Sequence, residues 1–457
     1  MKIVVLGGSP KGAKSGTMQY VNYIKMNATE HTFIEHYIAS EIHSIEFSEG
    51  KLQRIADDIR NADTVLWAFP LYFGLVHGSY KRFIELIWEK DIKSAFEGKH
   101  CAILATSIHF FDHTATEYIR GISEDLGMIV DEIYSPGSED LLGKNGTKNC
   151  DLFFKQWMKK IDDDVNTGRL TSPVDHRTPR VSFSGEQIFP VFADTKLGLV
   201  TESGISENLD AMVNMMVGRF ERSEIFDLSK MKIAGGCHGC LKCAYNNQCV
   251  YEGKDDVIDT YRKLKECDVI IFAGTIKDRY LSAKWKTFID RQFFSTHVPF
   301  LNGKVLGFII SGPLQQIPSL RELLTGSFEA NGLTIGGIVT DEGQNTAQQI
   351  HGLASSLRLY YKNDYHPPVQ FLGKAGQMIF RDTIFGGLKG VFVADHKYYK
   401  RNGLYDFPHK NWRKRIFTNV LYVAMRVPSF RRKVQRDMAD YIVRPYEKVI
   451  EKENNRK

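Results

Sequence analysis

Short apolar runs alternate with amphipathic segments along the first 165 residues of the chain. Five runs have the length and β-branched composition of buried strands: KIVVLGG, HTFIEHYI, DTVLWAFP, CAILATS and the weaker MIVDEIY. Between them, apolar residues recur at helical spacing in KLQRIADDIRNA, GSYKRFIELIWE and TATEYIRGISEDLG. Strands that alternate with helices predict an α/β fold with a parallel, doubly wound sheet.

The pattern then occurs a second time. Residues 63–85 align without gaps with residues 268–290 at an offset of 205, whereas KIVVLGGS aligns with KLGLVTES at an offset of 194. The second copy has therefore gained eleven residues between its first and third strands. We infer a tandem duplication. Five strands per copy favour the flavodoxin-like strand order, in which ligands bind at the carboxyl ends of the strands.

Four regions follow from these patterns. We expect a first domain over residues 1–165, a polar linker with three prolines over 166–190, and a second domain over 191–356. Residues 357–457 form a C-terminal extension, rich in aromatic and basic residues, which we expect to be helical.

Charge separates the extension from the rest of the chain. From Lys397 onward, 17 Lys and Arg face 6 Asp and Glu, a net charge of +11, while the other residues carry −5. We favour helices that pack across the two domains and cover the ligand pocket or an oligomer interface, ahead of docking to an acidic redox partner such as ferredoxin. A membrane-surface helix around residues 416–427 is the third interpretation. The chain has no recognisable nucleic-acid-binding module, and no apolar run long enough to span a membrane.

A glycine-rich loop, GGSPKGAKSGT, follows the first strand and leads into a helix. It is neither a Walker loop nor a G-x-G-x-x-G turn. Small residues, hydroxyl groups and lysines at a helix N-terminus suit a phosphate dianion, although a surface turn that binds nothing is the alternative. The candidate phosphate contacts are Ser9, Pro10, Lys11, Ser15, Gly16 and Thr17.

Two further loops follow strands and are expected to face a ligand. The loop after the third strand carries aromatic side chains that can lie along a flat heterocycle, while its backbone bonds the ring edge. The loop after the fourth strand is expected to complete the rim. The candidate contacts in these loops are Pro70, Leu71, Tyr72, Phe73, Gly74, Ser107 and His109.

Four of the seven cysteines stand in one thirteen-residue run, with the spacing C-x2-C-x2-C-x5-C: Cys237, Cys240, Cys243 and Cys249. Thiolates at this density suit an iron–sulfur cluster. Structural zinc more often uses two separated C-x2-4-C pairs, and a redox or vestigial thiol set is the remaining alternative. We favour the cluster and keep all three open. Asp255 and Asp256, after the run, are expected to cap the helix VIDTYRKLKEC.

On GGSPKGAKSGT, PLYFG and the helix after them, the chain resembles the NADPH-dependent FMN reductase branch of the flavodoxin-like fold. With the cysteine run added, it resembles the iron–sulfur flavoproteins of anaerobic microbes, as two tandem copies over residues 1–345. The resemblance implies FMN on a flavodoxin-like domain and a 4Fe–4S cluster on the four cysteines. It also implies that the cluster of one subunit lies near the flavin of a partner.

The two copies depart from that family in opposite ways. The first has the flavin loops and no cysteine run, whereas the second has the cysteines and a charged triplet, Lys277-Asp278-Arg279, in place of the aromatic loop. We therefore expect one FMN in the first copy and one cluster in the second. We also expect the copies to pack as a pseudo-dimer, with the cysteines facing the loops at Ser9 and Tyr72.

These features predict an FMN-dependent oxidoreductase that passes electrons from ferredoxin or NAD(P)H to a small-molecule acceptor, through a 4Fe–4S cluster. One alternative is a cluster-free NAD(P)H:FMN or quinone reductase. Another is a non-catalytic flavin-binding electron carrier that docks a protein partner. The sequence assigns no catalytic residue. We expect a cytoplasmic homo-oligomer that binds no nucleic acid.

Overall fold

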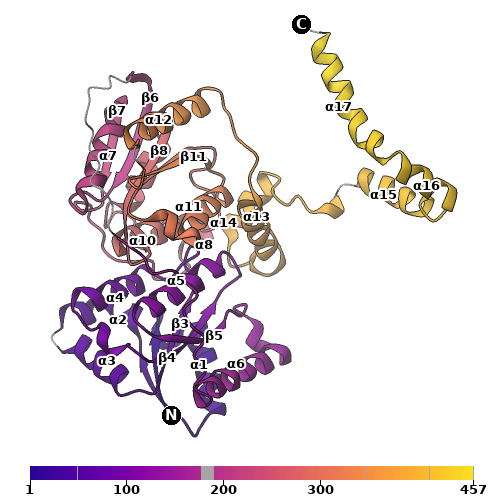
Figure 1. Ribbon diagram of the computed structural model, residues 1–457. Helices are drawn as coiled ribbons and strands as arrows, with labels where there is room; N and C mark the ends of the chain where they lie inside the picture. Colours follow the sequence, from indigo (N-terminus) through magenta and orange to yellow (C-terminus); the bar gives the residue numbers. More distant parts are fainter. Residues whose placement is uncertain (49, 177–189, 344, 411, 456–457) are drawn as a thin grey trace. The chain divides into compact units, whose positions relative to one another are not determined.

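The structure is a computed structural model that describes residues 1–48, 50–176, 190–343, 345–410 and 412–455. Its contacts divide the chain into two compact units, Met1–Tyr398 and Tyr399–Lys457. The first unit holds both sheets (Figure 1). The expected linker falls partly on residues 177–189, which lie outside the described residues.

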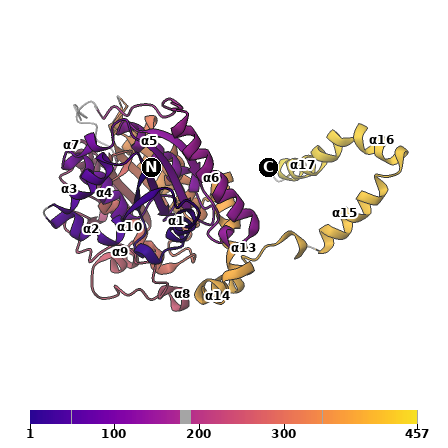
Figure 2. The same cartoon turned by 90° about the horizontal axis from the view of Figure 1, so that it is seen from below.

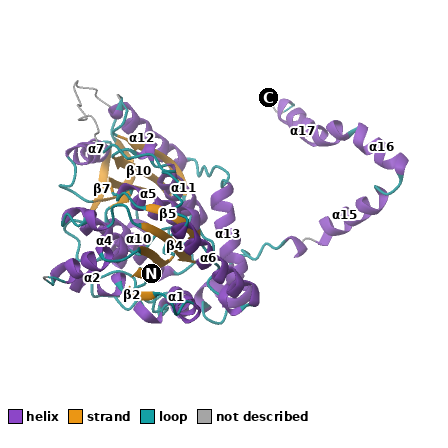
Figure 3. Ribbon diagram, turned by 60° about the horizontal axis from the view of Figure 1, so that its bottom comes forward, coloured by secondary structure: helices purple, strands orange, loops and turns teal. Residues whose placement is uncertain are grey.

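The first domain has five parallel strands in the order β2-β1-β3-β4-β5, which is the expected flavodoxin-like order. Helices cover both faces of the sheet (Figures 1 and 3), so the central strands are buried on both sides and read as continuous apolar runs. The strands are β1 (Lys2–Gly7), β2 (Thr32–His36), β3 (Thr64–Pro70), β4 (His100–Thr106) and β5 (Ile129–Tyr134). The helices are α1 (Gly16–Asn27), α2 (Ile38–Phe47), α3 (Lys51–Arg60), α4 (Gly78–Glu89), α5 (Asp112–Asp125) and α6 (Lys144–Asp162).

The second domain repeats this order as β7-β6-β8-β10-β11, with a short strand, β9, antiparallel to β8. Its last helix continues past the expected boundary at residue 356, because Leu357 is still buried in the domain core. The strands are β6 (Phe192–Thr201), β7 (Phe220–Asp227), β8 (Val269–Lys277), β9 (Tyr280–Leu281), β10 (Val305–Ser311) and β11 (Thr334–Thr340). The helices are α7 (Glu207–Val217), α8 (Cys243–Asn246), α9 (Val257–Lys265), α10 (Ala283–Arg291), α11 (Pro318–Ala330) and α12 (Thr346–Lys362).

Equivalent residues make equivalent contacts in the two domains. The Asp63 carboxylate accepts the N–H of Lys2 at 2.7 Å, and Asp268 accepts that of Lys196 at the same distance. Likewise, the ammonium groups of Lys99 and Lys304 donate to the carbonyls of Ala62 and Cys267 at 2.7 and 2.9 Å. Each of these pairs is separated by the offset seen in the sequence, so the duplication holds at the level of single hydrogen bonds.

The two domains pack against each other through α4 and α10, which lie side by side (Figures 2 and 3). These helices are equivalent in the two copies, so each copy presents the same surface to the other. Such an isologous interface is the geometry of a twofold-symmetric dimer. The expected pseudo-dimer is therefore present within one chain.

The C-terminal extension is helical, as expected. Its first helix, α13 (Phe371–Thr383), packs on α11, and a π-helical turn (Ile384–Leu388) leads to α14 (Val393–Arg401). The second unit contains α15 (Trp412–Ala424), α16 (Pro428–Arg436) and α17 (Met438–Asn454). Among the described residues, no helix is both long enough and apolar enough to cross a membrane.

Candidate active site

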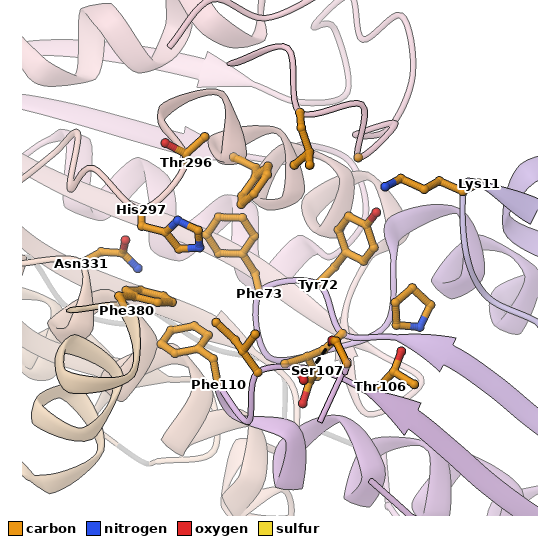
Figure 4. Close-up of a pocket in the computed structure, with 17 residues that line it drawn as sticks. Lys11, Tyr72, Phe73, Thr106, Ser107, Phe110, Thr296, His297, Asn331 and Phe380 are labelled. Atoms are coloured by element: carbon orange, nitrogen blue, oxygen red, sulfur yellow. Dashed lines mark hydrogen bonds between the residues drawn. The ribbon is translucent and has the colours of Figure 1, made fainter. Parts of the chain in front are cut away.

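A cavity of about 350 Å³ lies at the carboxyl ends of the first sheet's strands, where all three predicted loops meet. Its volume is in the range of small-molecule and cofactor sites. Thr106, Ser107 and Phe110 lie on one side, Thr296 and His297 lie opposite, and Tyr72 and Lys11 close one end (Figure 4). The lining residues are Lys11, Pro70, Leu71, Tyr72, Phe73, Thr106, Ser107, Ile108, Phe110, Ser138, Gly239, Leu241, Phe293, Thr296, His297, Asn331 and Phe380.

The glycine-rich loop brings only Lys11 to the cavity wall. The hydroxyl of Ser15 caps α1 by accepting the N–H of Met18 at 3.2 Å, and Thr17 shares a buried hydrogen bond of 2.6 Å with Thr106. Ser9 is buried and accepts the N–H of Lys11. Pro10 and Gly16 also lie outside the lining. The loop therefore contributes one cation to the cavity, and its hydroxyl groups hold the loop and the start of α1 in place.

The aromatic loop turns its side chains into the cavity. The N–H of Tyr72 donates to the Leu75 carbonyl at 2.7 Å and the reverse bond is 3.0 Å, which closes a tight turn with Gly74 at a φ of +67°. Burial raises the pKa of Tyr72 well above its usual value, so its phenol stays protonated. Gly74 itself does not line the cavity: a Cβ there would lie 2.3 Å from Leu323 on α11. This glycine is required for packing between the domains.

The third loop contributes Ser107 as expected, together with Ile108 and Phe110. His109 does not reach the cavity. Its side chain is exposed, and its Nδ1 lies 2.9 Å from the Asp112 carboxylate. The backbone of His109 has a φ of +63°, which turns the side chain outward and lets Phe110 point inward. The spacing of residues in the sequence does not tell which of the two neighbours, His109 or Phe110, points into the cavity.

The wall opposite these loops is formed in part by the C-terminal extension, as the favoured interpretation of the extension predicts, although the sequence does not identify its individual residues. It comes from the segment after α10, the end of α11 and the extension: Phe293, Thr296, His297, Asn331 and Phe380. Thr296 has φ +55° and ψ −121°, which is a strained conformation for a β-branched residue. The fully buried carboxylate of Asp395, on α14, holds it there, because it accepts the Thr296 hydroxyl and the His297 N–H at 2.6 Å each.

All four cysteines of the run line one small pocket of about 20 Å³ next to the cavity. The two spaces share Gly239, Leu241 and Phe293. Burial raises the pKa of Cys237 and of Cys243 to about 12 each. Among the described residues, no three His, Cys, Asp or Glu side chains are arranged to hold a metal ion.

The cysteine run faces the first domain's loops, as the pseudo-dimer hypothesis requires. His77 donates from Nε2 to the Cys237 carbonyl at 2.9 Å, while its Nδ1 accepts the N–H of Ser79 and caps α4. Burial lowers the pKa of His77 to about 3, so its ring is neutral. A Cβ on Gly239 would lie only 2.6 Å from the Tyr72 hydroxyl. The run and the aromatic loop are thus in direct contact.

The two carboxylates after the run hold its start, and one of them bonds the first residue of α9 as expected: Asp255 accepts the N–H of Val257 at 3.4 Å. Asp256 occupies the cap position without a side-chain cap bond and accepts the Lys232 N–H instead. Asp255 forms a buried, two-bond ion pair with Arg291 at 2.8 and 3.0 Å. Arg291 also donates to the Gly235 carbonyl at 2.9 Å and stacks over the Tyr251 ring. These contacts hold the start of the cysteine segment against α10.

In the second copy, acidic residues of the same domain accept hydrogen bonds from the loop that corresponds to the phosphate loop. Asp227 accepts both the N–H and the hydroxyl of Ser203, at 3.1 and 2.6 Å, and Asp210 accepts the N–H of Gly204. Burial opposes ionisation of Asp227, but the hydrogen bonds from Ser203 and Ser229 outweigh it and lower its pKa. The donors that would meet a phosphate are therefore already bonded.

The charged triplet of the second copy binds the first domain. Lys277 pairs with Glu89 at 2.6 Å, Asp278 lies 3.5 Å from Lys81, and Arg279 pairs with Asp125. Arg279 is almost fully buried and also donates to the Ser172 carbonyl. The charged triplet that replaces the aromatic loop thus forms interdomain ion pairs. It leaves no aromatic surface there on which a flat ligand could lie.

Comparison with known proteins supports the predicted resemblance. Residues 1–130 match the family of NADPH-dependent FMN reductases. An iron–sulfur flavoprotein of Archaeoglobus fulgidus is 25% identical over 213 residues, which cover 43% of this chain and 93% of that protein. A crystal structure of an apo NADH:FMN oxidoreductase is 19% identical and covers 36% of this chain and 91% of its own, with a TM-score of 0.30. General stress protein 14 of Treponema denticola, in complex with FMN, is 9% identical, with 35% and 98% covered and a TM-score of 0.27.

Proposed function

We propose that this chain is an FMN-dependent oxidoreductase with FMN in the first-domain cavity and a 4Fe–4S cluster on the cysteine run beside it. The observation that carries the proposal is that the cavity and the cysteine pocket have lining residues in common. Gly239 and Leu241, which stand between the cysteines in sequence, line both the cysteine pocket and the cavity formed by the flavin loops. The family match of residues 1–130 and the iron–sulfur flavoprotein relative support the same assignment.

The residues present fit both groups in their chemistry. The cavity has aromatic walls for a flat ring, Ser107 for its polar edge and Lys11 for a phosphate. Four cysteines on one pocket supply the soft donors of an iron–sulfur cluster. When bound, FMN supplies two-electron acceptance with one-electron release, and the cluster supplies one-electron transfer.

The protein's own groups have separate tasks in this assignment. Lys11 binds and orients the phosphate, and Tyr72 and Phe73 position the ring. Neutral His77 anchors the cysteine run to the first domain through the Cys237 carbonyl. Phe293 and Phe380 exclude water from the second-domain side of the cavity. The donor, ferredoxin or NAD(P)H, the homo-oligomeric state and the cytoplasmic location stay predictions.

A cluster-free NAD(P)H:FMN or quinone reductase is the second candidate. It is favoured by the absence, among the residues described, of a metal-binding arrangement of His, Cys, Asp or Glu side chains. In that case the same cavity binds FMN and an acceptor, and the cysteine run serves only as the cavity's second-domain wall.

Anaerobic purification with iron, sulfide and FMN analysis separates the two. We expect about four irons and one FMN per chain, with broad visible absorption beyond that of flavin. Cys240→Ser and Cys249→Ser should lose the iron and keep the FMN, while Cys267→Ser, a buried cysteine outside the run, should keep both. FMN without iron in the native chain would leave the cluster-free reductase. Turnover of NAD(P)H or reduced ferredoxin with a soluble quinone distinguishes an enzyme from a carrier.

A further inference from the structure

The second unit combines exposed apolar side chains with a dense positive charge. Residues 412–436 contain eight Lys and Arg and no Asp or Glu. The same segment exposes Trp412, Ile416, Phe417, Val420 and Val423, each more than half exposed. Large apolar groups at this density are unusual on a surface that only water covers.

The arrangement on α15 is that of an amphipathic helix. Trp412, Ile416, Val420 and Val423 follow one another at spacings of four, four and three residues, so they share one helical face. Leu421 and Met425 are less exposed than this stripe. After α15, the next helix begins at Pro428 and carries Arg431, Arg432 and Lys433. Along the chain, the apolar stripe of α15 is thus followed directly by a cluster of cations on α16.

From this arrangement we propose that α15 and α16 bind the surface of an anionic lipid bilayer, with the apolar stripe in the interface and the cations at the headgroups. A helix with Trp and aliphatic residues on one face and Lys or Arg beside them is suited to lie in the bilayer plane. Clusters of four to eight Lys and Arg on such a helix recognise anionic lipids. An acidic protein such as a ferredoxin would match the cations but leave the apolar stripe in water.

This binding differs from insertion across a membrane and does not depend on the proposed redox function. A peripheral contact would hold the catalytic domains beside the bilayer, where apolar electron acceptors dissolve. The proposal names only the lipid surface as the partner and is testable without turnover.

The test uses the full-length protein and vesicles in a co-sedimentation assay. We expect at least about tenfold stronger partitioning to phosphatidylcholine vesicles containing phosphatidylglycerol than to phosphatidylcholine alone, and a marked loss at high salt. Ile416→Ser/Val420→Ser/Val423→Ser removes apolar area without changing charge, and Arg431→Gln/Arg432→Gln/Lys433→Gln removes charge without changing that apolar stripe. Each should weaken binding to anionic vesicles by about tenfold or more.

The matched control is Met26→Ser/Phe47→Ser/Leu142→Ser, which removes three exposed apolar side chains from the first domain. It should bind vesicles like the native chain. Circular dichroism and the thermal midpoint of each variant verify that it is folded. Equal binding to neutral and anionic vesicles, or native binding by both α15 and α16 variants, would overturn the proposal. Salt-sensitive binding to an acidic ferredoxin with no vesicle binding would assign the surface to a protein partner instead.

Discussion

The carboxylate of Asp290 accepts the backbone N–H of Gly78 at 2.7 Å, across the interface between the two domains. The equivalent bond runs in the other direction, from the N–H of Ala283 to Glu85, also at 2.7 Å. Each carboxylate pairs with the lysine one turn earlier on its own helix, Lys286 or Lys81. The helix that follows the third strand in each copy therefore caps its counterpart, which explains why both lysines are buried.

Replacing Asp290 should destabilise the protein strongly. Asp290→Asn leaves Lys286 fully buried without its carboxylate, and we expect the free energy of unfolding to fall by about 3–5 kcal/mol. The double variant Lys286→Met/Asp290→Leu should lose less than Asp290→Asn, because no charge remains buried. Denaturant unfolding measures both. Lys159→Ala, which breaks an exposed pair with Asp163, should leave stability unchanged, and a double variant as unstable as the single would contradict this account.

Gly239 should control how closely the cysteine run approaches the flavin cavity. Gly239→Ala places a Cβ 2.6 Å from the Tyr72 hydroxyl, and we expect FMN binding to weaken by about tenfold or more as Tyr72 shifts. Flavin fluorescence titration measures the affinity. The control is Gly253→Ala, which has a similar positive φ of +71° but no neighbour within 4 Å of a new Cβ. If both variants lose the same affinity, backbone strain and not the Tyr72 contact is responsible.

FMN binding should depend on the phosphate loop of the first copy and not on the corresponding loop of the second copy. Lys11 is the cation of that loop at the cavity, so Lys11→Ala should weaken FMN binding by about tenfold, as expected for loss of a charged phosphate contact. Ser203→Ala alters the corresponding loop of the second copy and should leave the affinity and the FMN content unchanged. An affinity loss in Ser203→Ala comparable to that in Lys11→Ala would show that the second copy takes part in flavin binding.

Asp395 should act on the cavity as a positioning residue. Asp395→Asn replaces an acceptor of two 2.6 Å hydrogen bonds with a group that also donates, so the strained Thr296 should relax and move His297. We expect KM for a small acceptor to rise by about tenfold or more, with a smaller change in kcat. Asp382→Asn, an exposed carboxylate on α13, serves as the control. Unchanged kinetics with a lower melting temperature would reduce Asp395 to a structural role.

His36 should make the protein less stable in acid. Burial lowers the pKa of His36 below its usual value, an effect that Asp58 opposes only in part. The folded state therefore takes up the proton less readily than the unfolded chain. The stability associated with neutral His36 is present above pH 6.5 and is lost as the pH falls through the lower, folded-state pKa. His36→Gln should show a smaller drop in unfolding free energy between pH 7.5 and 5.5, and His43→Gln, an exposed position, the native drop.

The architecture was predictable because its determinants are local or periodic. Apolar runs such as KIVVLGG, and the offset that pairs Asp63 with Asp268, identify two doubly wound domains without any contact information. The first-domain loops were predictable for the same reason, since loops after strands meet at one sheet edge. Whether a loop residue points inward was not predictable: His109 and Phe110 are neighbours with opposite orientations, set by one backbone angle.

The individual residues of the cavity's second wall could not be derived from the sequence, because they depend on how the copies and the extension pack. Thr296, Phe380 and Asp395 are far apart along the chain, and no spacing connects them to a flavin site. In the sequence, the charged triplet at residues 277–279 indicates only the loss of an aromatic loop. Its interdomain ion pairs with Glu89, Lys81 and Asp125 appear only once the first domain is placed against it.

The joining of both copies in one polypeptide has a consequence for how the two halves can change. In a dimer of identical subunits, every substitution appears in both subunits, so a residue cannot change in one flavin loop without changing in the other. Here the halves are encoded separately, and Lys277 could replace an aromatic residue in one half while the other half kept Tyr72 at the equivalent position. Because the two domains are on one chain, the local concentration of one domain near the other does not depend on how dilute the protein is. The cysteine run and the cavity beside it are thus produced in a fixed one-to-one ratio and do not separate on dilution.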